Sequence, residues 1–487
     1  MKNIFIKALA GVMLTVGATS CGDKFLETNI YNGIDLDTGL NSVNNIGSAL
    51  NGCYDRLYRY YFAGNYATNI GDIASDLAYW NGDKGHFNTI NQFTYQPTDT
   101  YISYIWNYGY KVVDNSSRVI KACDALYADA SASDKEELTL YKAEAKALRA
   151  YATLTMTNVY GHQIKVNGQD YSSSLGVVVV DEPVQAYEEV KRNTVGECYT
   201  AVVNDLKEAI AGFEAVGDRE DLFVFGEAAA YGLLARTYLY MENYSEAITA
   251  AQKAISLSGI TTLTYDAKAY KALYNGGASN TESIFALAIT TTNNWSANSC
   301  GTLWSTYGIT PTPYCLALYG EDDIRKSIMT FAEEGSVPYY DGGKFGAYAT
   351  GNPANATNYL INAPEMFLIQ AEAYLKNNDE ASAKNALLVV AKRNTAITSV
   401  SDLPSGDALM TFIQDERGRE LFQEGHRLWD LRRWNKPAGL AAYDFPNIKF
   451  KFNNCQLADF LFPIPEGEIN TGFGVEQNSN WQSVKPQ

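Results

Sequence analysis

The clearest pattern along the chain is a helical repeat of small and large apolar positions. In residues 228–257 a first stripe of apolar side chains recurs at helical spacing, a short polar turn follows, and a second stripe begins. Ala235 and Ala247 stand where two helices must approach closely, and large side chains such as Tyr238 fill the seam between them. The pattern therefore predicts a pair of antiparallel helices with closely spaced axes.

The same unit recurs along the chain. A second copy begins at Pro364 and repeats the twelve-residue offset of its small residues at Ala371 and Ala383. A third copy is split into 142–161 and 196–213 by a polar insertion, and 43–59 with 105–126 forms a fourth pair. These features match the tetratricopeptide repeat, a helix–turn–helix unit of about 34 residues whose copies bury one another's apolar faces. We predict a mainly α fold, a tetratricopeptide-like scaffold of about four helix pairs.

Two long stretches break the helical pattern. Residues 61–104 and 258–360 are dense in Gly, Asn, Thr and Pro, and their many aromatic residues argue against disorder. We predict that they form a loop-rich lobe on the helical scaffold, and that 436–487 is an irregular segment. The repeat helices are expected at about 40–60, 105–126, 135–257 and 364–434, all within one domain that spans 21–487.

The first twenty residues predict export. Two lysines precede a short apolar core at residues 8–16, which is too short for a membrane span, and residues 1–20 therefore resemble a signal peptide. The run Ala18-Thr19-Ser20-Cys21 resembles the lipobox of bacterial lipoproteins, in which cleavage leaves the cysteine as a lipidated N-terminus. We expect lipidation at Cys21 and a protein anchored to a membrane by its acyl chains. The alternative is an ordinary secretory signal with an incidental cysteine.

Composition narrows the possible partners. A formal charge of −17 argues against nucleic acid and against a polybasic membrane contact. With 35 Tyr against 20 Phe, many rings carry a polar tip that suits a wet surface, although most tyrosines are expected in seams between helices. Among the cysteines, Cys300 and Cys315 are the closest remaining pair in sequence, but single buried thiols are the favoured reading.

Several motifs occur in an order that resembles the SusD/RagB family of surface lipoproteins. They are 20–27 (SCGDKFLE), 144–151 (EAKALRAY), 160–161 (YG), 192–195 (RNTV), 364–366 (PEM), 371–374 (AEAY), 416–421 (ERGREL), 424–427 (EGHR), 429–434 (WDLRRW) and 462–465 (FPIP). One departure is the longer, polar stretch 162–180 after the YG motif. The resemblance implies a scaffold of four tetratricopeptide-like units and a variable lobe that binds ligand at the cell surface. It also implies that oligosaccharide, or peptide in some members, passes to a SusC-like TonB-dependent transporter in the outer membrane.

Aromatic rings in the two loop-rich stretches are the candidate ligand-binding residues. A sugar ring offers a C–H face that stacks on an indole or phenol, and hydroxyl groups that need amide or carboxylate partners. In the family, stacking aromatics commonly come from these two regions. The candidates are Tyr79, Trp80, Asn81 and Asp83 in the first stretch and Trp295, Trp304 and Tyr307 in the second. The alternative is that one or more of these tryptophans anchor the loops internally, as expected for Trp106 in its helical context.

Nothing in the chain indicates catalysis or a cofactor. HExxH, GxSxG, Walker and helix-opening GxGxxG motifs are absent, and three histidines without metal-ligand spacing predict no metal site. We expect a non-enzymatic oligosaccharide-binding protein. A surface glycoside hydrolase stays open as an alternative, because two of the 55 acidic residues could pair in space, and peptide cargo is a further alternative.

The acidic and basic residues of 416–433 are expected to form a structural ion network around Trp429 and Trp434. Helical spacing suggests the pairs Glu416–Arg419 and Glu420–Arg427. His426, in the same segment, is expected to play a structural part in a packed turn.

Overall fold

A computed structural model describes residues 39–82, 84–185, 187–332, 339–436, 444–445, 448–449, 460–479 and 481–482. The expected signal peptide and lipidation site at Cys21 lie outside these residues, as does Asp83. Described residues from Ser42 onward belong to one structural unit. None of the described helices has both the length and the apolar character needed to cross a bilayer.

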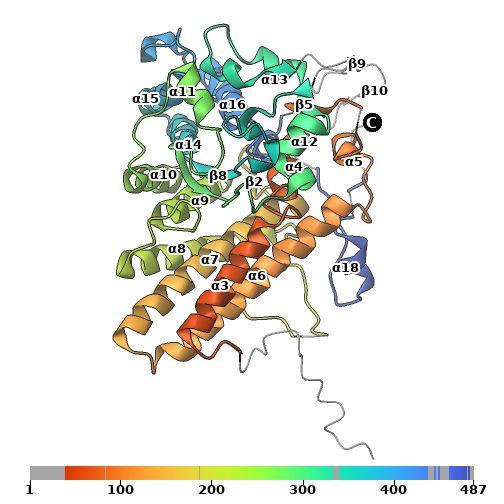
Figure 1. Ribbon diagram of the computed structural model, residues 1–487, viewed down its shortest axis with the longest axis vertical. Helices are drawn as coiled ribbons and strands as arrows, with labels where there is room; N and C mark the ends of the chain where they lie inside the picture. The colour runs from red at the N-terminus through yellow and green to blue at the C-terminus, as the bar shows by residue number, and fades with distance from the viewer. Residues whose placement is uncertain are drawn as a thin grey trace, which may run out of the picture. The chain divides into compact units, whose positions relative to one another are not determined.

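The predicted helix pairs form a continuous stack. In chain order its helices are α3 (Val43–Tyr58), α6 (Thr100–Tyr127), α7 (Ala132–Tyr160), α8 (Val195–Val216), α9 (Glu227–Tyr240), α10 (Tyr244–Ser258), α14 (Ala363–Lys376) and α15 (Glu380–Ala391). Each packs on the next, from α3 and α6 at one end to α14 and α15 at the other (Figure 1). The prediction of a tetratricopeptide-like helical scaffold is confirmed.

Small residues let the repeat helices approach one another, as the sequence pattern predicted. Ala235, Ala247 and Ala254 are completely buried, and Tyr238 is 5% exposed in the seam between α9 and α10. A Cβ atom at Gly212 of α8 would lie 2.8 Å from the Cβ atom of Ala143 in α7, so the approach of these two helices depends on the missing side chain. The repeat thus rests on close backbone approach combined with large apolar fillers.

The loop-rich stretches fold into short elements on this scaffold. The first contains α4 (Tyr66–Ile73), β1 (Ala78–Trp80) and α5 (Asn88–Asn91). The second contains α11 (Ala267–Ala272), β4 (Ser283–Ala286), η2 (Ser296–Asn298), α12 (Cys300–Thr306), β5 (Ile309–Pro311), α13 (Pro313–Ala317), η3 (Ile324–Ile328), β6 (Phe331–Ala332), β7 (Tyr339–Tyr340), η4 (Gly343–Phe345), η5 (Pro353–Asn355) and β8 (Tyr359–Asn362). Antiparallel pairing of β1 with β5 joins the two stretches, with Ala78 opposite Pro311 and Trp80 opposite Ile309.

The remaining elements complete the insertion and the C-terminal part. The polar insertion after α7 carries a small hairpin of β2 (Lys165–Val166) and β3 (Gln169–Asp170). The C-terminal part contains η6 (Val400–Asp402), α16 (Asp407–Leu421), α17 (Arg427–Arg433), β9 (Asp444–Phe445), β10 (Ile448–Lys449) and α18 (Glu466–Asn470). In the part of the chain that is described, every strand pair is antiparallel and two-stranded.

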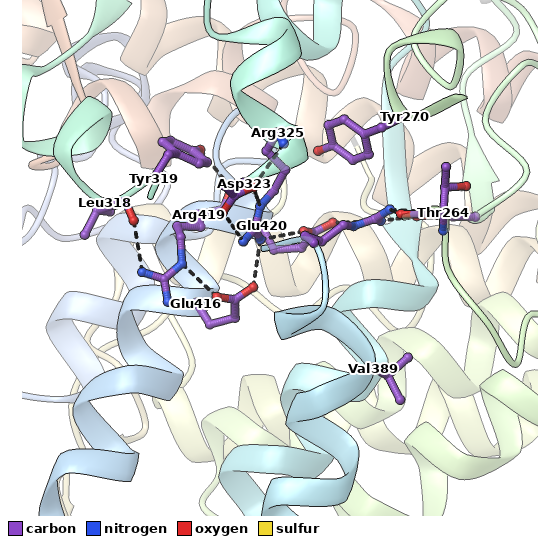
Figure 2. A network of polar contacts seen from close by, with 12 residues as sticks. Thr264, Tyr270, Leu318, Tyr319, Asp323, Arg325, Val389, Glu416, Arg419 and Glu420 are labelled. Carbon is purple, nitrogen blue, oxygen red and sulfur yellow. Dashed lines mark hydrogen bonds and ion pairs between the residues drawn. The ribbon is translucent and has the colours of Figure 1, made fainter. Parts of the chain in front are cut away.

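The expected ion network is present and joins α16 to the lobe. Figure 2 shows Arg325 between Asp323 and two glutamates of α16, at 2.8 Å from Asp323, 2.7 Å from Glu416 and 2.8 Å from Glu420. All four side chains are at most 2% exposed. Burial opposes ionisation of Glu416, but the positive charges of Arg325 and Arg419 outweigh it and lower the pKa of Glu416 to about 2.

One of the two predicted ion pairs is correct. Arg419 lies 2.7 Å from Glu416, as predicted, but Glu420 does not pair with Arg427. Arg427 instead binds Asp76 at 2.7 Å. The reason is that α16 ends at Leu421 and the chain turns through Gly425, whose φ is +78°, so helical spacing does not extend to Arg427.

The same segment ties α17 to the repeat helix α14. Glu372 of α14 accepts hydrogen bonds from Arg433 and, at 2.9 Å, from Nε1 of Trp434. His426 is buried, and burial lowers its pKa to about 3, so it is neutral in the folded protein. The prediction that residues 416–433 form a structural ion network is confirmed.

The described cysteines are free, buried thiols. They are Cys53, Cys123, Cys198, Cys300 and Cys315. Cys300 and Cys315, the nearest pair in sequence, do not form a disulfide, and Cys300 instead accepts a hydrogen bond from Asn69 at 3.1 Å. The favoured reading of buried single thiols is confirmed for these residues.

Candidate ligand-binding surface

A continuous set of half-buried aromatic rings lies where α3 ends beside α6 and the lobe. We call it the tyrosine surface. Its members are Tyr60, Tyr61, Tyr66, Tyr101, Tyr104, Tyr108 and Trp295.

Ring-to-ring contacts run through the whole set. The ring centroid of Tyr61 lies 3.9 Å from that of Tyr60, 4.2 Å from that of Tyr104 and 4.7 Å from that of Tyr108. Tyr60 contacts Trp295 on its other side at 5.5 Å. The rings therefore support one another while each keeps part of its surface in water.

Two local features of the sequence place these rings. Tyr101, Tyr104 and Tyr108 are spaced i, i+3 and i+7, which puts them on one face of α6. The turn after α3 carries Tyr60 and Tyr61, and it closes tightly at Gly64, where a Cβ atom would lie 2.2 Å from the carbonyl oxygen of Tyr58. The result is a helix face set against a tight turn.

Trp295 connects the lobe to this surface. Its Nε1 donates a hydrogen bond to the carbonyl oxygen of Tyr58 at 2.9 Å, and its ring lies 4.8 Å from the Tyr58 ring. The Arg59 guanidinium lies 5.2 Å from the indole ring and is itself held by Asp55 at 2.8 Å. Trp295 is thus fixed in orientation while it stays half-buried.

Tyr307 and Trp80 lie beside the far end of the surface. Tyr307 stacks on His86 with centroids 3.8 Å apart and an interplanar angle of 11°. The next residue, Phe87, stacks on Tyr101 at 4.0 Å, which links this pair to the tyrosine surface. Trp80 is half-buried in β1, opposite Ile309. The structure therefore brings together the two stretches from which the candidate rings were drawn.

The expectation that Trp304 is an exposed platform is wrong. Its side chain in α12 is completely buried, and its Nε1 donates a hydrogen bond to Oδ1 of Asn69 at 2.8 Å. The ring packs edge-on against Phe422, with centroids 5.3 Å apart. A short helix with few apolar residues needs such an anchor to join the scaffold, and this was the alternative reading.

Tyr79 and Asn81 also lie beneath the surface. They are 9% and 7% exposed, respectively. Asn81 supports the turn before β5: its backbone N–H donates to the carbonyl oxygen of Gly308 at 2.8 Å, and its side chain fills the space that a Cβ atom at Gly308 would need. These two residues position the loops and do not offer an exposed face to a ligand.

The phenols of Tyr60 and Tyr66 remain neutral. Burial, followed by the neighbouring tyrosines, raises the pKa of Tyr60 and Tyr66 above the ordinary value. Neutral hydroxyl groups can both donate and accept hydrogen bonds. The surface thus combines apolar ring faces with uncharged polar tips.

The sequence contained a signal for the missed residues. The run YRYYF at 58–62 and the tyrosine spacing within 100–110 mark one aromatic helix face and its neighbouring turn. The sequence alone predicts most tyrosines in helix seams, because apolar spacing does not distinguish a buried helix face from a half-exposed one.

The fold is that of a helical-repeat protein, and comparisons with known proteins identify the family. The model described as "SusD family" matches residues 339–481, and the model described as "Starch-binding associating with outer membrane" matches residues 24–239. The chain belongs to the SusD/RagB-like family. No curated protein matches it significantly.

Solved structures share this fold. A putative sugar binding protein from Bacteroides vulgatus has a TM-score of 0.78 and 25% identity, over 91% of this chain and all of that one. A SusD superfamily protein from Bacteroides thetaiotaomicron has a TM-score of 0.77 and 22% identity, over 90% of this chain and 99% of that one. A SusD-like carbohydrate binding protein from Bacteroides vulgatus has a TM-score of 0.74 and 20% identity, over 92% and 98%.

Proposed function

We propose that the protein is a non-catalytic, cell-surface lipoprotein that binds oligosaccharide on its tyrosine surface. It passes this cargo to a SusC-like TonB-dependent transporter in the outer membrane. The observation that carries the proposal is the tyrosine surface itself, a set of mutually supported rings that are half open to water. The family description and the names of two relatives, which point to starch and sugar, support the same ligand class.

In this proposal, stacking recognises the faces of the sugar rings and hydrogen bonds recognise their hydroxyl groups. The C–H faces of sugar rings lie on Tyr60, Tyr61, Tyr108 and Trp295, and the neutral phenols hydrogen-bond to sugar hydroxyls. Because the rings are already packed against one another, little side-chain entropy is lost when the ligand binds. Affinity for each sugar unit is modest, and a longer oligosaccharide that covers several rings binds more tightly. Trp80 and Tyr307 extend the same surface toward β1 and β5.

In this proposal the protein binds the glycan and does not cleave it. Glycoside hydrolysis needs two carboxyl groups that flank the scissile bond. Asp55, which holds Arg59 beside Trp295, is engaged in ion pairs with both Arg59 and Arg56. Incubation of the purified domain with a bound glycan should release no reducing ends, and their release would reject the non-catalytic proposal.

Ring-removal variants test the surface. Tyr61→Ala and Trp295→Ala should each weaken glycan binding about tenfold in calorimetry or affinity electrophoresis, since a stacked ring contributes about 1 kcal/mol or more. Tyr127→Ala is the control, because Tyr127 is a tyrosine of the same helix α6 that is 46% exposed and has no place on the surface. If both ring variants bind the glycan as the unmodified protein does, the proposed surface is wrong.

Anchoring and delivery need their own test. Extraction of membranes with mild detergent should yield the protein together with a β-barrel transporter, and a Cys21→Ser precursor should no longer partition with the membrane. Recovery of the unmodified protein alone after gentle extraction would contradict the transporter partnership and leave the glycan proposal standing.

A further inference from the structure

The α6 end of the tyrosine surface carries a positive charge that no carboxylate among the described residues neutralises. The Lys111 ammonium lies 4.1 Å from the ring centroid of Tyr108, and the residue is exposed. Across the described ranges, no carboxylate lies within ion-pair distance of this ammonium. The cation therefore borders a binding surface while it is free to pair with something else.

A second cation lies beside the first. Burial lowers the pKa of Lys111, and the nearby positive charge of Arg56 lowers it further. Arg56 is only partly compensated, because it shares Asp55 with Arg59: the Asp55 oxygen is 2.8 Å from Arg59 and 3.3 Å from Arg56. Arg56 on α3 and Lys111 on α6 thus place two like charges on packed neighbouring helices, an arrangement that an anion would stabilise.

The local charge is opposite to that of the whole chain. Residues 55–59 and 104–118 contain four cations and two acidic residues, whereas the chain has a formal charge of −17. Asp114, the second acid, is already bound by Arg118 at 2.6 Å. Because exposed charges act over about 10 Å at moderate ionic strength, this local excess rather than the net charge decides what the surface attracts.

The surface continues past Lys111 into a groove. This groove has a volume of about 420 Å³ and runs along α6 between that helix, the insertion and α18. Its lining includes the cations Lys111 and Arg118 and the acids Asp114 and Glu468. Asp114 is paired with Arg118, and Glu468 accepts a hydrogen bond from Nε1 of Trp106 at 3.1 Å. A chain-like ligand that leaves the Tyr61 and Tyr108 rings therefore meets Lys111 and then a site with further polar groups.

We propose that the ligand of the tyrosine surface is an anionic glycan, whose carboxylate or sulfate groups pair with Lys111 and Arg56 while its sugar rings lie on Tyr61 and Tyr108. This inference rests on the proposed glycan-binding function and narrows it to one class. Uronic acids and sulfated sugars offer the same chemistry, a compact anion on a hydroxyl-rich ring.

A panel of polysaccharides tests the charge class. The probes are dextran as a neutral chain, polygalacturonate with carboxylates only, carrageenan with sulfates only, and chondroitin sulfate before and after chemical desulfation. In affinity electrophoresis at 50 mM NaCl, a gel that contains at least one of the anionic probes should slow the migration of the protein, and a gel that contains dextran should not. A probe that slows the protein is called a retained probe. Raising the salt to 500 mM should weaken that retention about tenfold. The retained probe shows whether the anion is a carboxylate or a sulfate.

Matched lysine variants locate the contact. Lys111→Gln should weaken binding of the retained anionic probe about tenfold and reduce its salt dependence. Arg56→Gln should do so to a smaller extent. Lys121→Gln is the control, because Lys121 lies on the same helix, is exposed and is paired with Glu182 at 2.8 Å. All three side chains are exposed or partly exposed, so the variants should fold as the unmodified protein does.

The outcomes separate the two proposals. Retention of dextran alone, with no effect of salt, overturns the anionic class and leaves glycan binding in place. Anionic retention that Lys111→Gln and Lys121→Gln weaken equally also overturns it, since the binding would then be non-specific. If no probe of any charge is retained, the proposed function fails and this inference fails with it.

Discussion

At the scale of single residues, Trp304 and Trp295 show how one residue type serves two purposes in the same lobe. Trp295 has one edge fixed by the Tyr58 carbonyl and part of its ring in water. Trp304 is completely buried and bonded to Asn69. Both stand among Asn, Ser and Thr in the sequence, so their surroundings along the chain do not distinguish them.

Replacing Trp304 should therefore affect stability. Trp304→Ala should lower the free energy of unfolding by about 3–5 kcal/mol, because it leaves a large cavity in the lobe. Trp80→Ala should cause a clearly smaller loss, since part of its ring already faces water. Urea unfolding followed by circular dichroism measures both, and equal losses for the two variants would contradict the assignment of Trp304 as an anchor.

The charge of Arg325 is a second case in which a single residue contributes to the stability of the lobe. Arg325→Ala should lower the free energy of unfolding by about 3–5 kcal/mol at pH 7. Asp323 would stay buried without its cation, and Glu416 and Glu420 would each keep only one of two cations. Lys326→Ala is the neighbouring control, with an exposed ion pair that contributes less than about 1 kcal/mol.

The effect of Arg325→Ala should also depend on pH. With Arg325 present, the folded-state pKa of Glu416 is lowered to about 2, so its contribution to stability is complete above its ordinary value of 4.5 and is lost only as the pH falls toward 2. Without Arg325, only Arg419 opposes the effect of burial, so the pKa of Glu416 rises and this carboxyl protonates at a higher pH in the variant. The difference in unfolding free energy between the two proteins should narrow as the pH falls from 7 toward 3, and a constant difference would contradict this account.

At the scale of elements, contacts between backbones fix how the loop stretches meet the helices. A Cβ atom at Gly71 of α4 would lie 2.0 Å from the carbonyl oxygen of Gly425, in the turn that precedes α17. Neither backbone can move without disturbing its element. The missing side chain at Gly71 is therefore what allows α4 to pack on this turn.

Two glycine variants test this contact with the same substitution. Gly71→Ala should lower the free energy of unfolding by about 1–3 kcal/mol through overpacking. Gly52→Ala in α3 should raise it by about 0.5–1 kcal/mol, because nothing lies within 4 Å of the new methyl group and alanine favours the helix. Thermal unfolding gives both signs, and stabilisation by Gly71→Ala would show that α4 does not approach the turn this closely.

At the scale of the whole molecule, the proposed ligand surface joins segments that are far apart in sequence. It draws on 58–66, on 101–111 and on 293–307, which belong to a helix end, a helix face and a loop of the lobe. A ligand that spans these segments stabilises all of them by binding only the folded arrangement.

Hydrogen–deuterium exchange should show this joint effect. A saturating glycan should slow amide exchange in all three segments at once, because local opening of any one would break the bound surface. Helices α14 and α15, in another part of the stack, serve as the internal control and should exchange as before. Protection confined to the lobe would contradict a site shared with α3 and α6.

The repeat scaffold could be predicted because its information is local. The small residues Ala235 and Ala247 and the large residue Tyr238 indicate which helix faces pack together. The same periodicity predicts the helix pairs 43–59 with 105–126 and 142–161 with 196–213, and both pairs are in contact. The candidate site could be predicted only in outline. The sequence predicts that the two loop stretches form one lobe, but it does not single out the six tyrosines of the surface as candidates.

The sequence by itself determined the helical hairpins, the aromatic richness of the two loop stretches and the family motifs, because each depends on residues close together along the chain. Only the tertiary structure decided which rings face water. Exposure depends on what packs on the other side of a ring, and for Trp304 and Asn81 that is a partner from a distant segment. The free charge of Lys111 was decided in the same way, since an ion pair depends on which carboxylates folding brings within reach.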